Sequence, residues 1–372
     1  MSPGPLSLGF LRSAYGWPYL LTPLIPVAVA LDLAGASATA VFVTSALGIV
    51  PTAALMGRAT EELAARSGPG IGGLLNVTFG NAPELIIALF ALGQGLHEVV
   101  KASIIGSIIG NILLVLGAAM LVGGIGRDKQ VFSRTSASVQ TSMLLLAAAA
   151  LLMPAIFELV EGKGLPAPGA EIIDYGSTVE HLSLAVAVVL IATYILGLVF
   201  SLKTHRDLFN PDYGDEDSWG WSVRTSVLAL AIAGVLVGVM SEVLVGSISE
   251  ASESAGLSEF FIGVIVVAIV GNAAEHWVAV LVARKDKMDL SVNIAIGSSA
   301  QVALFVAPVL VLASLLIGPH PLALVFNGFE LGAILLAVVI ANYITNDGES
   351  NWFEGVQLLA VYLVLGIAFY YA

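Results

Sequence analysis

Two short stretches, GNAPE at residues 80–84 and GNAAE at residues 271–275, say most about the fold of this 372-residue chain. Each places a glutamate beside a long apolar run. LIIALFAL follows the first glutamate, and VIVVAIV precedes the second motif. A carboxylate at membrane depth costs about 3 kcal/mol on insertion scales, so such residues are rare there and usually functional. The two stretches therefore indicate a membrane protein with two functional acids, Glu84 and Glu275.

The two stretches also belong to an internal repeat, because residue 271 stands 191 positions after residue 80. At the same offset, Gly106-Ser107 pairs with Gly297-Ser298, and Gly72 pairs with Gly263. These matches fall on Gly, Asn, Glu and Ser rather than on interchangeable Leu and Val, so chance agreement does not explain them. The chain is predicted to contain two copies of one unit.

The composition independently predicts a polytopic membrane protein. Hydrophobic residues make up 58% of the chain and charged residues only 11%, where a soluble domain carries about 25% charged residues. The absence of cysteine excludes disulfides, thiolate metal sites and cysteine nucleophiles. About eleven apolar segments are long enough to cross a bilayer at ~20 residues each. They are residues 17–33, 37–56, 70–93, 99–122, 136–157, 179–202, 223–246, 257–283, 289–316, 321–343 and 352–371.

The basic residues orient these segments. With the amino terminus in the cytoplasm, all but Lys101 and Lys163 of the 14 Lys and Arg residues fall on the cytoplasmic side. Cytoplasmic loops of membrane proteins carry an excess of Lys and Arg, so this one-sided distribution supports the chosen orientation. The loops on the other side are acidic. We interpret their charges mainly as solvated surface, although they could also concentrate cations at an outer opening.

The predicted fold class is all-α, with one extra amino-terminal helix followed by two inverted five-helix repeats. Residues 1–36 hold the extra helix, 37–202 the first repeat, 203–222 an acidic cytoplasmic linker, and 223–372 the second repeat. Because five is odd, the second copy enters the membrane from the opposite side. Inverted repeats of this kind are typical of secondary transporters, whose substrate site lies near the midplane between the repeats.

The chemistry expected around the two glutamates is that of a cation site. Neither span has a Lys or Arg at that depth, so a bound cation or a proton must balance the carboxylates. Ca²⁺ prefers several oxygen ligands, including carboxylates, amide and backbone carbonyls. The predicted supporting ligands are the amides of Asn81, Asn272 and Gln301, the hydroxyls of Ser107 and Ser298, and carbonyls that become exposed if the helices break where Gly80 and Gly271 permit it.

The same acids suggest the ion that moves in exchange. Two ionised carboxylates in a low-dielectric site are costly when Ca²⁺ is absent, so protons should replace the metal. Competition for one pair of carboxylates is enough to couple the two fluxes. No resident cofactor and no nucleic-acid partner are predicted, and the expected partners are Ca²⁺, protons and the lipid bilayer. A homo-oligomer is compatible with the sequence.

Other polar residues in the spans have competing interpretations. The glycines 106, 110 and 297 fit close helix packing as well as ligation, and both serines fit interhelical hydrogen bonding. His276 and Asn111 are expected to support the site rather than bind the ion. Glu242 is a further candidate on the ion pathway, and Glu330 is an additional intramembrane acid.

At these motifs the sequence resembles the Ca²⁺/H⁺ antiporter family of the Ca²⁺/cation antiporter superfamily. The resemblance rests on residues 72–92, 101–117, 261–280 and 287–312. It implies eleven helices, exchange of Ca²⁺ for protons at Glu84 and Glu275, and a site lined by the motif asparagines, the two serines and Gln301. It also implies that helices two and seven slide over the core, with Glu61, Glu62, Glu250 and Glu253 meeting entering cations. The short amino terminus favours a prokaryotic inner-membrane protein.

Three alternatives stay open at the level of sequence. A Na⁺/Ca²⁺ exchanger of the same superfamily carries Thr-Ser where this chain has Gly-Asn, and other exchangers move Mn²⁺ or Cd²⁺. An intramembrane hydrolase is disfavoured because no nucleophile elbow or HExxH pattern is present, so the chain is not predicted to be an enzyme. A channel would have no need for two proton-competing carboxylates.

Overall fold

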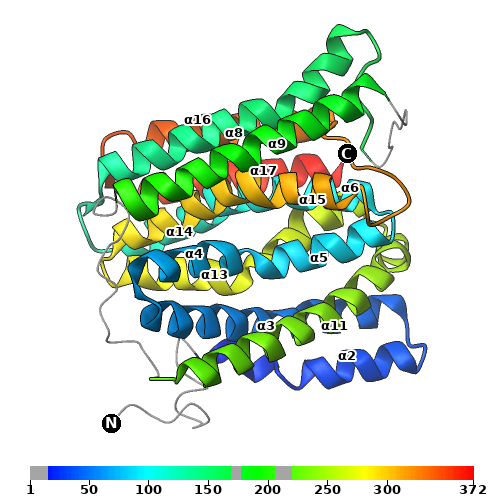
Figure 1. Ribbon diagram of the computed structural model, residues 1–372, viewed down its shortest axis with the longest axis horizontal. Coiled ribbons are helices and arrows are strands. Elements are labelled where there is room, and N and C mark those ends of the chain that lie inside the picture. The colour runs from blue at the N-terminus through cyan, green and yellow to red at the C-terminus, as the bar shows by residue number, and fades with distance from the viewer. Residues whose placement is uncertain (1–15, 169–176, 206–219) are drawn as a thin grey trace.

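The computed structural model describes residues 16–168, 177–205 and 220–372, and this part of the chain is built almost wholly of helices (Figure 1). The acidic run at 207–217 lies outside these ranges. In chain order, the elements are η1 (Trp17–Leu21), α2 (Leu24–Leu33), α3 (Ala38–Arg66), α4 (Gly68–Gly80), α5 (Ala82–Gly93), α6 (His97–Ile109), η2 (Gly110–Val115), α7 (Leu116–Gly124), β1 (Gln130–Val131), α8 (Arg134–Val160), α9 (Thr178–Val199), η3 (Phe200–Thr204), α11 (Val223–Ala255), α12 (Glu259–Phe261), η5 (Ile262–Val267), α13 (Ala268–Arg284), α14 (Met288–Gln301), η6 (Val302–Val306), α15 (Ala307–Ala313), α16 (Gly328–Ile344), β2 (Glu349–Ser350) and α17 (Trp352–Tyr370).

The lengths of these helices suit a membrane protein. Within the described ranges, eight helices are long and apolar enough to cross a bilayer, and the bent pair α4–α5 makes a ninth. Two shorter apolar stretches, residues 17–33 and 328–344, coincide with the remaining predicted spans. The helices are therefore compatible with the eleven spans expected from the sequence, and the all-α membrane fold is confirmed.

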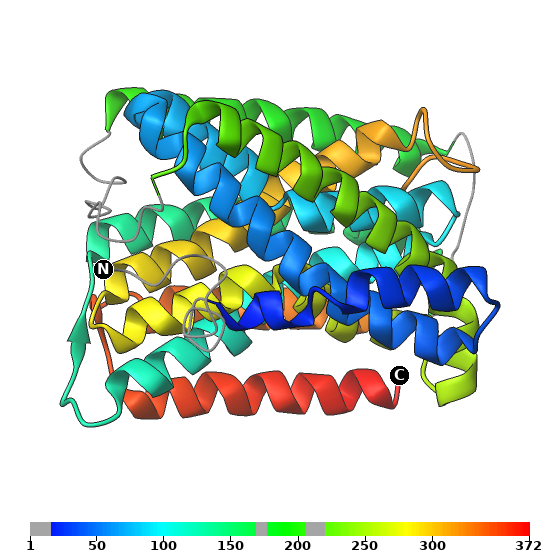
Figure 2. The same ribbon diagram turned by 90° about the horizontal axis from the view of Figure 1, so that it is seen from below.

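The helices form layers that run along the long axis of the molecule. Figures 1 and 2 show α2, α3 and α11 together on one side, with α3 and α11 packed against each other. The middle of the bundle holds α4–α5, α6, α13 and α14, and α8, α9 and α16 cover the other side. Every residue of α6 is buried. Helix α6 therefore lies in the interior of the bundle, and its polar residues, Glu98 and Lys101 among them, are buried with it.

Close helix packing in this middle layer depends on glycine. A Cβ at Gly106 of α6 would lie 2.1 Å from the carbonyl oxygen of Val264 in η5, and one at Gly263 would lie 2.8 Å from Cβ of Ala102. Backbone cannot yield at such distances, so α6 and η5 reach this separation only because both positions lack a side chain. Gly106 thus packs two helices together, which was one of its two interpretations from sequence.

The first motif breaks its helix, and the second does not. The chain bends by 42° between α4 and α5, at Asn81. Pro83 has no backbone N–H, so the hydrogen bond to the carbonyl four residues earlier is lost there. Ala274 occupies the equivalent place in the second half and keeps its N–H. Helix α13 accordingly continues from Ala268 to Arg284 through GNAAE. The break that Gly271 was expected to permit does not occur in α13, because a glycine alone does not remove a hydrogen bond.

The second half is interrupted elsewhere, by widened π-helical turns. One of them, η5, immediately precedes α13. Two others occupy matching places in the two halves. Turn η2 begins at the end of the GSIIG segment (106–110), and η6 directly follows the GSSAQ segment (297–301). Turns of this kind are often found at functional sites in helices. Their recurrence places an irregular backbone beside Ser107 and Ser298 alike.

Candidate functional site

Glu84 lies in the first turn of α5, directly after the bend at Asn81. Its side chain is buried, with 9% of its surface exposed. A carboxylate in the first turn of a helix is stabilised by the positive end of the helix dipole. The bend therefore creates a helix amino terminus deep in the bundle and places an acid at it.

Glu275 comes from the second half and is half-buried in α13, one turn after Gly271. Ser298 of α14 donates a hydrogen bond from Oγ to Glu275 Oε2 over 3.1 Å. The same hydroxyl lies 2.9 Å from Oδ1 of Asn81. One serine thus links the acid of the second motif to the amide of the first.

The two motifs interlock through their glycines. A Cβ at Gly80 would lie 2.9 Å from Glu275 Oε1, and a Cβ at Gly271 would lie 2.9 Å from Glu84 Cγ. Each acid therefore occupies the space left open by the glycine of the other motif. Real Cβ atoms are essentially never found so close to another heavy atom, so a side chain at either glycine would displace the glutamate of the other motif.

The asparagines and serines repeat the same cross-connection. Asn272 donates from Nδ2 to Oγ of Ser107 over 3.1 Å, which mirrors the contact between Asn81 and Ser298. Asn81 also donates from Nδ2 to Oε1 of Gln301 over 2.6 Å. All seven predicted supporting residues therefore lie within one connected region around the two glutamates.

Some oxygens in this region lack a protein partner. Glu84 Oε1 and Asn272 Oδ1 are buried without a hydrogen bond. Buried acceptors normally have a partner, because leaving one unpaired costs about 1–3 kcal/mol. Among the described residues, no three His, Asp or Glu side chains converge as a ready-made metal site. A cation bound here would therefore take its remaining ligands from amides, hydroxyls and backbone carbonyls.

Three residues expected near the pathway lie at different places. His276 and Asn111 contact each other, with 3.0 Å between Nε2 and Oδ1, and so connect α13 to η2 beside the motif. Glu242 lies on α11 with its side chain exposed. The structure therefore places the first two beside the core of the site and Glu242 on the surface of its helix.

Sequence reasoning missed how the carboxyl-terminal end of α3 is organised. Arg58 forms ion pairs of 3.2 Å with Glu61 and 2.8 Å with Glu62. Glu62 is buried and also accepts a hydrogen bond from the backbone N–H of Trp221, just before α11. Glu61 is close enough to Glu275 for their charges to interact. The spacing of Arg58, Glu61 and Glu62 on one helical face was a signal that could have revealed this group.

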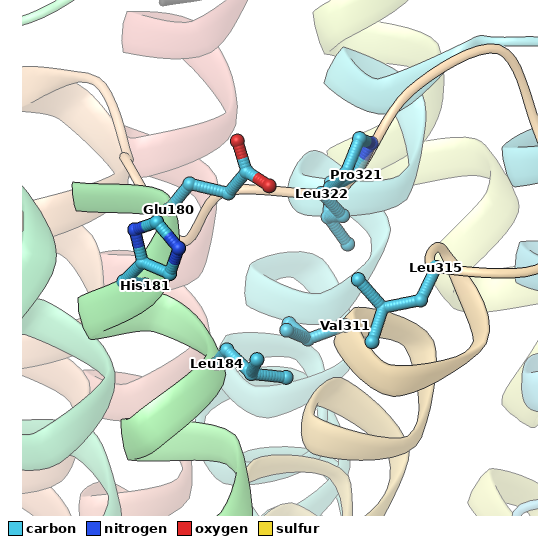
Figure 3. A pocket seen from close by; sticks show the side chains of 7 residues that line it. All are labelled: Glu180, His181, Leu184, Val311, Leu315, Pro321 and Leu322. Carbon is cyan, nitrogen blue, oxygen red and sulfur yellow. The ribbon is translucent and has the colours of Figure 1, made fainter. Parts of the chain in front are cut away.

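A small cavity is lined by other residues. Its volume is about 170 Å³. Figure 3 shows it between α9 and the end of α15. Glu180 and His181 lie at its rim, and the remaining lining side chains are apolar. None of the motif residues lines it, so it does not belong to the candidate site.

Comparison with known proteins places this geometry in a family. A family model described as sodium/calcium exchanger protein matches residues 37–203 and 225–371. A Ca²⁺/H⁺ antiporter of Synechocystis is 46% identical over 95% of this chain and 96% of its own length. The Ca²⁺/H⁺ antiporter ChaA of Bacillus subtilis is 41% identical over 93% of this chain and 96% of its own.

The chain belongs to the Ca²⁺/H⁺ antiporter family of the Ca²⁺/cation antiporter superfamily. A solved structure, that of native YfkE, agrees, with a TM-score of 0.81 and 38% identity over 95% of this chain and all of its own. Membership in a family of ion exchangers confirms the resemblance found at the motifs. It also places the chain among transporters.

Proposed function

We propose that this protein exchanges Ca²⁺ for protons across a membrane by alternating access, and that Glu84 and Glu275 bind the two ions in turn. The observation that carries the proposal is the interlocking of each acid with the glycine of the opposite motif. Two carboxylates from opposite halves then meet at one place. A single ion that neutralises both also holds the two halves together.

The oxygen atoms of the site suit Ca²⁺. Two carboxylates, three amides and two hydroxyls lie in the connected region, and Ca²⁺ takes six to eight oxygen ligands. Nitrogen and sulfur ligands, which favour transition metals, are few, because the chain has no cysteine and His276 contacts Asn111 instead. The Gly-Asn pairs before each acid contribute amides where hydroxyls would suit Na⁺. These features favour Ca²⁺ over Na⁺ or a softer divalent cation.

Protons are the natural exchange ion at this place. Burial makes an unpaired carboxylate costly, so each acid must take up a proton when the metal leaves. The unpaired oxygen of Glu84 and the serine bound to Glu275 give the two acids different surroundings, so the two protons need not bind equally well.

The architecture supports two inverted repeats with α2 outside them, at residues 37–202 and 223–372. The matching π-helical turns and the mirrored Asn–Ser contacts support this division. Helices α3 and α11, which pack together, are the pair that slides over the rest. The distribution of basic residues supports a cytoplasmic amino terminus. The similarity to antiporters of Synechocystis and Bacillus subtilis supports a prokaryotic inner membrane.

Transport in proteoliposomes tests the proposal. Radioactive Ca²⁺ uptake is measured under an imposed pH gradient, with and without Na⁺ on the opposite side. Uptake should follow the pH gradient and ignore Na⁺. Uptake driven by Na⁺ in the absence of a pH gradient would favour a Na⁺/Ca²⁺ exchanger, and uptake without any counter-gradient dependence would favour a channel.

A further inference from the structure

A second group of buried charges lies away from the two motifs. Lys101 of α6 is 3% exposed, and its Nζ lies 2.6 Å from Oε1 of Glu98, one turn earlier. Nζ also donates to the backbone carbonyl of Val325, 3.1 Å away. Glu330 of α16 is fully buried, and the charges of both Lys101 and Glu98 act on it. We call Glu98, Lys101 and Glu330 the α6–α16 cluster.

Glu330 has a half-satisfied carboxylate. It closes a capping box with Asn327, whose backbone N–H donates to Glu330 Oε2 over 2.8 Å and whose Oδ1 accepts from the N–H of Glu330. The other oxygen, Oε1, is buried without a hydrogen-bond partner. A carboxylate that leaves one oxygen unpaired in the interior is far less costly when it carries a proton.

The charges of the α6–α16 cluster do not balance. Two ionised carboxylates and one ammonium leave one negative charge, which a buried site cannot keep cheaply. Titratable groups on α6 and on the neighbouring α8 include His97, whose ring meets that of His320 edge to face with centroids 4.0 Å apart, and Glu158, which pairs with Lys163. One more positive charge is needed, and a proton on Glu330 supplies it where the oxygen is unpaired.

The position of the cluster relates it to the exchange site. Lys101 precedes Ser107 by six residues of the same helix, which is ~9 Å along the axis at 1.5 Å per residue. Ser107 contacts Asn272 at the motifs. The cluster therefore lies between the exchange site and the end of the bundle where the 314–327 segment connects α15 to α16, on the right of Figure 1.

From these observations we infer that the α6–α16 cluster is a second proton-binding centre, through which protons pass between the Glu84–Glu275 site and that end of the molecule. The inference rests on the proposed function, because it supplies the protons of that exchange. In one step, the proton on Glu330 passes to the carboxylate of Glu84 or Glu275 that Ca²⁺ has left, and Glu330 is left ionised near Lys101. In the next, the Glu330 carboxylate takes up a proton from water at the 314–327 end, while Lys101 stays paired with Glu98.

A purely structural role predicts different behaviour. Lys101 fastens the segment around Val325 to α6, and a brace of this kind works with Glu330 protonated permanently. A brace does not change protonation as the pH changes, whereas a proton carrier must. The two roles therefore differ in whether Glu330 titrates in the folded protein.

Glu330→Gln separates the roles with little structural change. Glutamine at this helix position also completes a capping box and has nearly the same volume, but it cannot titrate. Glu354→Gln is the matched control. Glu354 closes the same box with Asn351 on α17, accepting from its backbone N–H over 3.0 Å. Any effect of weakening a capping box is therefore shared by both variants.

Two measurements are made on the full-length protein. Infrared difference spectra between high and low pH should show a carboxylic-acid C=O band that Glu330→Gln removes and Glu354→Gln keeps. In proteoliposomes, Glu330→Gln should lower the proton-driven Ca²⁺ uptake rate about 100-fold, the lower end of what positioned proton-transfer groups contribute. The uptake rate of Glu330→Gln should also depend less on the pH of the solution at the 314–327 end. The uptake rate of Glu354→Gln should depend on that pH as the wild-type rate does.

The inference is overturned if Glu330→Gln keeps the wild-type rate and pH profile, or if no pH-dependent band belongs to Glu330. Where Glu330→Gln fails to fold, Glu98→Gln replaces it. That variant leaves Lys101 and Glu330 as a neutral ion pair, so the band should disappear there too, and its persistence contradicts the inference. Failure of wild-type Ca²⁺/H⁺ exchange with a normal Glu330 band would instead refute the proposed function alone.

Discussion

The space that a side chain would need at Gly80 is occupied by Glu275, because a Cβ there would lie 2.9 Å from Glu275 Oε1. Gly271 and Glu84 have the same relationship in the opposite direction. The absence of a side chain at each glycine thus leaves the space in which the glutamate of the other motif lies. This relationship explains why the sequence pairs each glutamate with a glycine four residues before it.

The first prediction concerns these glycines. Gly80→Ala should displace the Glu275 carboxylate and weaken Ca²⁺ binding about tenfold, since overpacking costs ~1–3 kcal/mol. Gly271→Ala should act similarly through Glu84. Isothermal titration of the purified protein with Ca²⁺ measures both. Gly332→Ala in α16, where a Cβ meets nothing within 4 Å, is the control and should bind normally. Unchanged Ca²⁺ affinity in Gly80→Ala would contradict the interlocked geometry.

The second prediction concerns the serine that joins the motifs. Ser298→Ala removes the hydrogen bonds to Glu275 and Asn81. A hydrogen bond to a charged group contributes about 1.5–3 kcal/mol, so Ca²⁺ affinity should fall roughly 10-fold or more. Ser299→Ala is a neighbouring control, because Ser299 donates only to the backbone carbonyls of Ile108 and Ala295. Equal Ca²⁺ affinities of the two variants would show that the hydrogen bonds of Ser298 do not contribute to Ca²⁺ binding.

Sequence alone could locate the site because its polar residues interrupt otherwise apolar spans. The same reasoning could not predict that α13 continues through Gly271 while the chain bends at Asn81. Both segments read GNAxE, and they differ within the motif only at Pro83 and Ala274. The π-helical turns η2 and η6 were equally hidden, because an extra residue in one turn leaves hydropathy unchanged.

The third prediction is the pH dependence of Ca²⁺ binding. Protonation of Glu84 or Glu275 removes a charged ligand, so apparent Ca²⁺ affinity should fall as the pH falls and recover as it rises. With two competing acids, the slope of log affinity against pH should exceed one and approach two. In Glu84→Gln the slope should not exceed one. Equilibrium binding of radioactive Ca²⁺ at several pH values measures this, and a pH-independent affinity in the wild type would be inconsistent with proton competition.

The fourth prediction concerns the carboxyl-terminal end of α3. Glu61→Lys places a positive charge where a negative one now interacts with Glu275. The apparent Ca²⁺ affinity in transport should fall several-fold, since exposed charge interactions amount to about 0.2–1 kcal/mol each. The loss should shrink at high salt. Glu349→Lys reverses an exposed acid that pairs with Lys129, and it should leave uptake unchanged. Identical results for both variants would remove Glu61 from the cation pathway.

Contacts between distant segments explain the remaining gaps in the sequence prediction. Glu330 was recognised as an intramembrane acid, but its grouping with Lys101 and Glu98 depends on α6 and α16 coming together. Spacing reveals Glu98 and Lys101 as neighbours, three residues apart on one helix. Nothing in the spacing relates them to residue 330. Internal repeats helped with the motifs because both partners carry the same signature, and the α6–α16 cluster has no such copy.

The central claim is most directly tested by Ca²⁺ uptake in proteoliposomes under an imposed pH gradient, comparing the wild type with Glu84→Gln and Glu275→Gln. Glutamine keeps the size of each side chain but can neither release a proton nor neutralise Ca²⁺. Both variants should fold, as judged by gel filtration and thermal unfolding, and both should lose exchange. Proton-driven Ca²⁺ uptake at the wild-type rate in either variant would contradict the claim that the two acids form one site.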